Sequence, residues 1–170
     1  MEIKKIYIDM DGVLADFAGG VRKLCGLEPL SQNDKHRDRT LDDEMWERIR
    51  KCDNFYNRLD PISGAIRMFG RIYDHYEERC EILTGIPKEE RGIVQAADDK
   101  REWVRRLLSE DVCVNIVNWR EKIKFCKGEG YVLIDDSKKI ICSWNEAGGI
   151  GILHISTEET IRELGILGIF

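Results

Sequence analysis

The sequence lacks paired cysteines. Its six cysteines are scattered, none belongs to a CxxC pair, and no two Cys or His residues have the spacing of zinc ligands. Several cysteines lie inside apolar segments such as VCVNIV and IICSW. We therefore expect reduced, buried thiols in a cytoplasmic protein, and no zinc site.

The sequence also lacks the features of a membrane protein or of a general nucleic-acid binder. No apolar run approaches the length of a membrane-spanning helix, and the opening residues MEIKKIYI are too charged for a signal peptide. The formal net charge of −5 argues against a broad surface for phosphate backbones. We therefore expect a small-molecule partner, with no nucleic acid and no membrane.

The chain does contain enough apolar sequence for one folded domain. It has 170 residues, 42% of them hydrophobic, and no internal repeat or low-complexity tract. Residues 17–60 differ from the rest because they are polar and charged, with helical stretches near 16–26 and 41–51. The Pro and Gly of DPISG end this segment. We predict that 17–60 is an inserted helical segment outside the sheet.

Short apolar runs alternate with helical patterns through the rest of the chain. The runs predict buried strands at 3–9, 80–85, 112–118, 131–135 and 149–155. Helices are predicted from an N-cap at Ser63, over 96–108 and 138–147, and from about Thr157. In the helix at 96–108 we expect Trp103 in the core and Lys100 as an exposed charge. This alternation predicts an α/β fold with a parallel sheet covered on both faces.

Polar residues follow the predicted strands. They are Asp9 and Asp11, Thr84 and Gly85, Asn118 to Lys124, and Asp135 and Asp136. The carboxyl ends of parallel strands lie at one edge of a sheet, so these residues should meet there. Carboxylates that close together do not all stay ionised without a cation, and a hard ion such as Mg²⁺ prefers oxygen ligands. The sequence therefore predicts a magnesium site, with the Thr and Lys leaving room for an anion beside it.

The motifs at these strand ends resemble a known family. DMDGVLAD, ILTG, a Lys after the third strand and LIDDS are similar, in this order, to the four motifs of the haloacid dehalogenase-like phosphohydrolases. DMDGVLADF, EKIKFC…VLIDDS and SWNEAGGIGILH resemble more closely the 5′(3′)-deoxyribonucleotidases and their bacterial and phage relatives. The resemblance implies a doubly wound, Rossmann-like sheet of order 5-4-1-2-3. It also implies a core of residues 1–16 and 61–170 with a helical cap at 17–60.

The resemblance implies catalytic and metal-binding roles for the acidic residues. Asp9 would be the nucleophile that forms an aspartyl-phosphate, and Asp11 would act as general acid and then general base. Asp9, the backbone carbonyl of Asp11 and Asp136 would hold Mg²⁺, with Asp135 supporting them. The expected activity is the hydrolysis of nucleoside or deoxynucleoside monophosphates.

The resemblance also implies which residues bind the substrate. Thr84, the Gly85 amide and Lys122 would bind the phosphate, and Phe17 would contact the nucleoside. Lys124 and Lys127 also lie near the third strand. We expect Lys122 to be the lysine of the site because it lies about one helical turn beyond the strand end and can reach back over it.

Several alternatives remain open from the sequence. Asp11 before Gly12 is also a common turn pair, Thr84 could simply end a strand, and 135–136 could cap a helix. Trp46, Phe55 and Tyr56 could stack on a base or form the core of the cap. The substrate could be a sugar phosphate, and a receiver-like signalling domain also combines an acidic pocket with Thr and Lys. A homodimer is possible.

Overall fold

The computed structural model describes residues 2–170, which form a five-stranded parallel sheet. Its strands are β1 (Lys5–Ile8), β2 (Cys80–Gly85), β3 (Val114–Val117), β4 (Tyr131–Asp135) and β5 (Ile150–Leu153). Their spatial order is β3-β2-β1-β4-β5, which is the predicted order read from the opposite edge. The predicted fold class is therefore confirmed, and every strand end lies within two residues of the predicted one.

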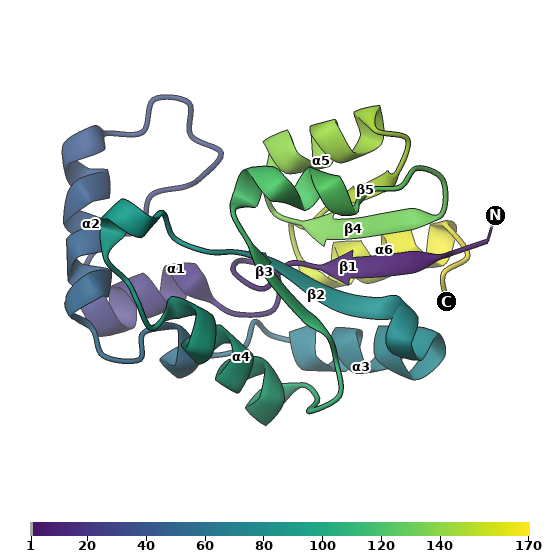
Figure 1. The fold of residues 1–170 in the computed structure, drawn as a ribbon, viewed down its shortest axis with the longest axis horizontal. Helices are drawn as coiled ribbons and strands as arrows, with labels where there is room; N and C mark the ends of the chain where they lie inside the picture. Colours follow the sequence, from purple (N-terminus) through teal and green to yellow (C-terminus); the bar gives the residue numbers. More distant parts are fainter. Residues whose placement is uncertain (1) are drawn as a thin grey trace.

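Helices cover both faces of the sheet (Figure 1). They are α3 (Ala65–Tyr76), α4 (Ala96–Leu107), the 3₁₀ helix η5 (Trp119–Phe125), α5 (Lys138–Glu146) and α6 (Thr157–Ile166). Neighbouring residues of β1 point to opposite faces, so Ile6 and Ile8 pack in the core with α3, α4 and α6, whereas Tyr7 packs with α5 and η5. None of the helices within residues 2–170 is long and apolar enough to cross a membrane.

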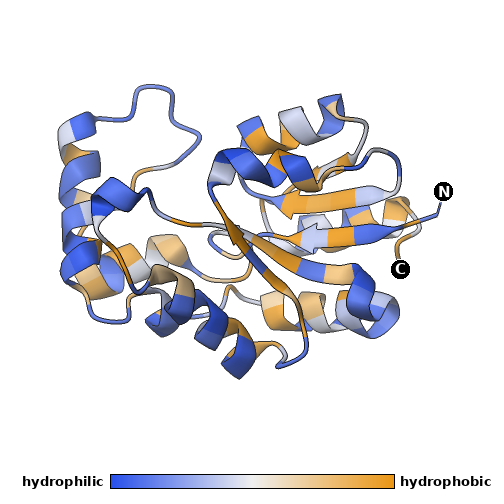
Figure 2. Cartoon of the chain, in the orientation of Figure 1, coloured by the Kyte–Doolittle hydropathy of each residue, from blue (hydrophilic) through white to orange (hydrophobic). Residues whose placement is uncertain are grey.

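Residues 17–60 contribute helices but no strand to the sheet. They form α1 (Phe17–Gly20), a π-helical turn η1 (Val21–Cys25), α2 (Arg39–Lys51) and a 3₁₀ helix η2 (Tyr56–Arg58). In Figure 1, β1 and β4 point toward the side of the molecule where α1 and α2 lie. The loop before α2 is mostly hydrophilic (Figure 2). This arrangement agrees with a cap over the carboxyl ends of the strands, and the division into core and cap stays a prediction.

Two contacts join this segment to the rest of the fold near its end. The indole Nε1 of Trp103 donates a hydrogen bond to the carbonyl of Leu59 at 2.8 Å, and Trp103 is fully buried, as predicted. The amide of Asp16 donates to the carbonyl of Asp60 at 2.8 Å, so the two ends of the segment lie side by side. The segment therefore leaves and re-enters the sheet domain at one place.

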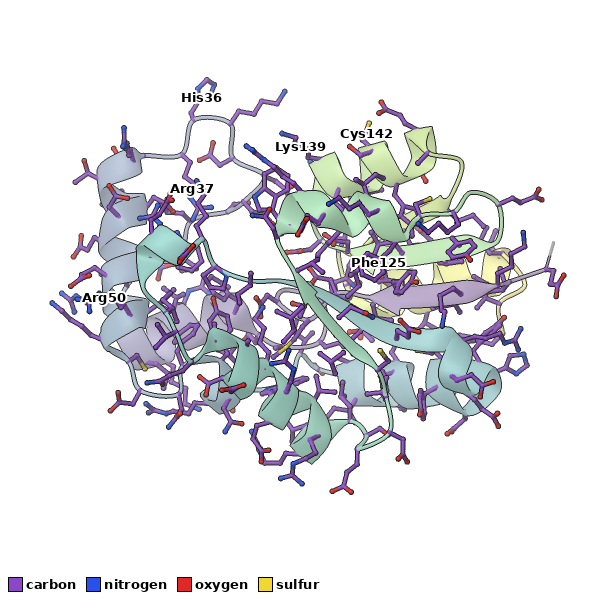
Figure 3. The ribbon with its side chains drawn as sticks, in the orientation of Figure 1. His36, Arg37, Arg50, Phe125, Lys139 and Cys142 are labelled. Carbon is purple, nitrogen blue, oxygen red and sulfur yellow. The ribbon has the colours of Figure 1, made fainter. Side chains whose placement is uncertain are left out.

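Two local predictions were wrong. Helix α3 is capped by Gly64, in the left-handed region at φ 77°, whereas the Ser63 carbonyl accepts a hydrogen bond from the Thr157 hydroxyl. The cysteines are all free, but only Cys25 and Cys80 are fully buried, and two are exposed, Cys113 and Cys142. Cys142 lies on the outer side of α5 (Figure 3), because an apolar neighbourhood in sequence does not decide which face of a helix a residue occupies.

Candidate active site

The carboxyl ends of three neighbouring strands bring buried polar residues together. Asp9 directly follows β1, Thr84 is the last residue but one of β2, and Asp135 ends β4. The Asp9 amide donates to the Ile134 carbonyl at 2.9 Å, which extends the β1–β4 pairing to the acidic residues. All three residues are buried, at 6% exposure or less. The parallel register therefore places them at one edge, in the crevice where the strand order reverses.

Three carboxylates form a cluster at this edge. Asp9, Asp135 and Asp136 each offer an oxygen, and these oxygens lie within 4.8 Å of one another. Gly12 approaches the cluster so closely that a Cβ there would lie 2.2 Å from Oδ2 of Asp136, and its φ is +80°. The Asp-Gly pair thus does form a turn after β1. The turn carries the chain past the acidic cluster, so the turn and the cluster are both present.

Lys122 is the lysine that lies beside Asp9. Its ammonium is 2.9 Å from Oδ1 of Asp9 and 2.7 Å from Oδ2 of Asp135, and its side chain is 4% exposed. Burial disfavours the charge, but Asp9 and Asp135 outweigh it and raise the pKa of Lys122 above its ordinary value. Lys124 instead pairs with Glu121 on the surface, and exposed Lys127 donates to a backbone carbonyl. The predicted position of Lys122 is therefore observed, and its role stays a prediction.

The acidic cluster has more negative charge than Lys122 neutralises. Burial first, and the charge of Asp9 second, raise the pKa of Asp135 to about 6 and that of Asp136 to about 8. Both oxygens of Asp135 are already engaged, because Oδ1 accepts from the Ser137 amide and Oδ2 from Lys122. Asp9 and Asp136 keep free coordination capacity. Oxygen donors with an uncompensated charge fit a hard divalent cation such as Mg²⁺.

Asp11 lies on the other side of the site and is held by a residue that the sequence interpretation placed elsewhere. Lys100 was expected to be an exposed charge, but it is 0% exposed. Its ammonium donates to Oδ2 of Asp11 at 2.6 Å, to the Thr84 hydroxyl at 3.0 Å and to the Gly85 carbonyl at 2.7 Å. It also lies 4.7 Å from the centre of the Tyr56 ring. The prediction failed because α4 packs this face against η2 and the strand ends.

The two oxygens of Asp11 differ. Oδ2 accepts from Lys100, whereas Oδ1 is buried and has no hydrogen-bond partner within residues 2–170. Burial raises the pKa of Asp11 although Lys100 lowers it, and the charge of Asp9 raises it further. A buried carboxylate oxygen without a hydrogen-bond partner is unusual in a folded protein.

The loop before α2 reaches the site through two side chains that no sequence signal singled out. Gln32 donates from Nε2 to Oδ1 of Asp136 at 2.6 Å. Asn33 donates to the carbonyl of Asp136 at 2.9 Å and accepts from the amide of Lys138 at 3.0 Å. The loop is polar and irregular in sequence, so nothing in its pattern predicted these contacts. His36 lies farther out, at the outer turn of the loop (Figure 3).

Phe17 belongs to an aromatic cluster beside Lys100. Its ring centre lies 6.1 Å from that of Trp46, 5.6 Å from that of Phe55 and 6.3 Å from that of Tyr56. Phe55 and Tyr56 are 1% exposed, so they form the core of the segment, which was one of the two alternatives. Phe17 and Trp46 are only partly buried. They are the two rings of this cluster that keep some exposed surface.

The sequence is related to a phage protein over most of its length. A protein of Vibrio phage KVP40 named "Putative 5′(3′)-deoxyribonucleotidase" is 31% identical over 157 residues, which cover 91% of this chain and 76% of the phage protein. The chain belongs to the haloacid dehalogenase-like phosphohydrolases, in the family of this phage protein. No family model matches the chain.

Solved structures of hydrolases share the fold. A hydrolase from Streptococcus pneumoniae TIGR4 superposes with a TM-score of 0.54 at 10% identity, covering 99% of this chain and all of that one. A hydrolase of the haloacid dehalogenase family from Deinococcus radiodurans R1, solved with bound phosphate and sodium, superposes with a TM-score of 0.53 at 14% identity. The superposition covers 94% of this chain and 87% of that one. At such low identity these likenesses show the fold alone.

Proposed function

We propose that this phosphohydrolase is a Mg²⁺-dependent phosphomonoesterase that acts on nucleoside or deoxynucleoside monophosphates through an aspartyl-phosphate on Asp9. The observation that carries the proposal is the pairing of two aspartates with different surroundings. Asp9 lies among carboxylates beside Lys122, and Asp11 keeps one buried oxygen without a partner. A nucleophile and a proton donor need such different settings. The name of the phage relative supports the nucleotide substrate.

The first half of the reaction forms the phosphoenzyme. A carboxylate oxygen of Asp9 attacks phosphorus, the ester P–O bond breaks, and the departing alkoxide takes a proton from Asp11. The Met10 amide, at 2.8 Å, and Lys122, at 2.9 Å, both hold Oδ1 of Asp9 and fix the plane of the attacking carboxylate. Such orientation accounts for a large part of the rate of a displacement at phosphorus.

The second half returns the enzyme to its starting state. Asp11, now ionised, takes a proton from a water molecule that attacks phosphorus, the bond between phosphorus and Asp9 breaks, and phosphate leaves. The water adds one oxygen to phosphorus and Asp11 regains its proton, so atoms and charges balance. The raised pKa of Asp11 suits a group that must hold a proton in one half and release it in the other.

Several hydrogen-bond donors and cations would stabilise the negative charge of the phosphoryl group. Thr84, the Gly85 amide and Lys122 would bind its oxygens. Mg²⁺, held by Asp9, Asp136 and the Asp11 carbonyl, would supply further positive charge to these oxygens. Because the Thr84 hydroxyl oxygen accepts from Lys100, its own hydrogen is left to donate to a phosphate oxygen.

Two other functions compete with this one. A sugar phosphate would use the same phosphate site, but Phe17 and Trp46 offer partly exposed rings that suit the flat face of a base. A receiver-like domain would carry its phosphorylated aspartate at the end of β3. Here β3 ends at Val117 and is followed by Asn118. The nucleotidase function therefore fits the residues best.

A substrate screen tests the proposal. Phosphate release would be measured from nucleoside monophosphates, sugar phosphates and nitrophenyl phosphate, with Mg²⁺ and with a chelator, and Asp9→Asn would serve as the control for contaminating phosphatases. We expect Mg²⁺-dependent release that is fastest for a nucleoside monophosphate and absent in the variant. Fastest turnover of a sugar phosphate would overturn the substrate, and activity in the chelator would overturn the metal dependence.

A further inference from the structure

Lys100 is a buried charge to which the proposed chemistry gives no direct contact with the substrate. It lies in the first half of α4, and its side chain has no exposure to solvent. An ammonium in such a position is unfavourable unless acceptors surround it. The arrangement of those acceptors shows what the charge does.

The ammonium of Lys100 has as many acceptors as it has hydrogens. Its three N–H groups reach Oδ2 of Asp11, the hydroxyl of Thr84 and the carbonyl of Gly85, at distances of 2.6 to 3.0 Å. An ammonium with all three hydrogens engaged has none to offer to a substrate. Lys100 therefore acts on a ligand only through the residues that it holds.

Two of these contacts and one ring fix the ammonium in place. The contacts to Thr84 and Gly85 attach it to the end of β2, the strand that neighbours β1. The face of the Tyr56 ring lies on another side, 4.7 Å away, and Tyr56 is itself 1% exposed. A cation held against an aromatic face in a dry site is stabilised there. The third hydrogen thus points to Asp11 from a fixed position.

We propose that Lys100 is a positioning residue that holds Oδ2 of Asp11, so that the unpartnered Oδ1 faces the leaving group and carries the proton. This inference rests on the proposed function, because Asp11 must be the general acid. The bond to Lys100 distinguishes the two oxygens of the carboxyl, since Oδ2 is engaged and Oδ1 is free. Without Lys100 the carboxyl can rotate, and the proton is found on either oxygen.

The dependence on the leaving group separates this role from a merely structural one. A nucleoside alkoxide needs a proton to depart, whereas nitrophenolate departs without one. Loss of the positioning residue should therefore lower the rate of hydrolysis far more for a nucleoside monophosphate than for nitrophenyl phosphate. The value of kcat/KM reports the steps up to phosphoenzyme formation, so it isolates the departure of the leaving group.

The experiment compares Lys100→Met with Arg101→Met, which removes an exposed cation from the next position of the same helix. We expect Lys100→Met to lower kcat/KM for a deoxynucleoside monophosphate about 100-fold, and at least ten times more than for nitrophenyl phosphate, because general acid catalysis contributes about 10²–10⁴-fold. Arg101→Met should leave both values unchanged. Thermal melting would check folding, and Lys100→Gln would replace the Met variant if it does not fold.

Two outcomes would overturn the proposal in different ways. Equal losses on both substrates, or no loss on either, would show that Lys100 serves phosphate binding or stability and does not act through Asp11. The proposed function would survive that result. If the parent protein hydrolysed neither substrate, the proposed function would fall and the positioning role with it.

Discussion

The two buried lysines belong to two sides of the site that are built differently. Lys122 follows the end of β3 closely and sits among carboxylates, with Asp9 and Asp135 in direct contact. Lys100 comes from α4 and meets one carboxylate, Asp11, together with Tyr56 from the 17–60 segment. We call these the acidic side and the cap side. The acidic side gathers negative charge that a single lysine does not neutralise, and the cap side matches one ammonium to one carboxylate.

The comparison shows how one edge of a sheet can hold a metal and a nucleophile on one side and a proton donor on the other. The excess charge on the acidic side is what a divalent cation and a nucleophile require. The paired charges on the cap side leave one oxygen of Asp11 free, which is what proton transfer requires. Changes on the acidic side should therefore stop the chemical step, whereas changes in the aromatic residues of the cap side should alter which substrate is used.

The largest effect is expected on the acidic side, at the nucleophile. Asp9→Asn keeps the shape of the side chain but removes the attacking charge, so turnover should fall by about 10⁴-fold or more, as for the loss of a covalent nucleophile. Steady-state phosphate release would measure this, with thermal melting to confirm folding. Activity within tenfold of the parent would rule out the covalent mechanism.

The next effect compares two lysines of the same short helix. Lys122→Ala should lower kcat about 10²–10³-fold, because a charge aimed at the transferring phosphoryl group is lost. Lys124→Ala, the matched control, removes an exposed ammonium that pairs with Glu121, and should leave kcat nearly unchanged. If Lys124→Ala were the more damaging change, the phosphate would lie on the outer side of η5.

On the cap side, Phe17→Ala tests whether the aromatic cluster selects the substrate. We expect a rise in KM for nucleotides of about ten- to a hundredfold, since stacking on a base contributes about 1–3 kcal/mol. Nitrophenyl phosphate should be nearly unaffected, and kcat for it should not change. An equal loss on both substrates would mean that Phe17 only supports the packing of Phe55 and Tyr56.

The smallest effect is the pH dependence of stabilisation by Mg²⁺. In the folded, metal-free protein, burial and the charge of Asp9 raise the pKa of Asp135 to about 6 and that of Asp136 to about 8, from an ordinary value of 3.8. As the pH rises from about 4 to about 8, the unfolded chain loses these protons before the folded one does, so the metal-free fold loses stability. Mg²⁺ binds the deprotonated carboxylates and should restore it.

Melting curves with and without Mg²⁺ at about pH 5.5 and about pH 8.5 measure this dependence. We expect Mg²⁺ to raise Tm by several degrees at the higher pH and by much less at the lower one. Asp136→Asn should abolish the difference, and Asp98→Asn, at an exposed surface carboxylate, should not. If Mg²⁺ raised Tm by the same amount at both pH values, the result would contradict a metal site on the acidic side.

The acidic side could be predicted from the sequence because its geometry follows from chain connectivity. Asp9 and Asp135 come at the carboxyl ends of apolar runs, and parallel strands place such ends together. Lys122 follows soon after a third run, within reach of the same edge. Each step uses only residues that are close to a strand end in the sequence.

The cap side could not be predicted in the same way, because it depends on packing between distant elements. Lys100 lies among charged residues in an amphipathic helix, and only the packing of α4 against η2 decides that it is buried. The same holds for Gln32 and Asn33, which reach Asp136 on the acidic side from an irregular polar loop whose path no periodic pattern reveals. Propensity and spacing describe single elements, whereas these contacts belong to the assembled fold.

The most direct measurement of the proposed mechanism is the capture of the phosphoenzyme. Asp11→Asn would be mixed with Mg²⁺ and radiolabelled nitrophenyl phosphate, whose leaving group departs without a proton, and then quenched in acid, digested and mapped by mass spectrometry. Because this variant lacks the base that activates water, any phosphoenzyme should persist, and we predict one phosphoryl group on the peptide that contains Asp9. Asp9→Asn should carry none. Label on another residue, or phosphate release from the variant at the parent rate without any labelled protein, would contradict covalent catalysis by Asp9.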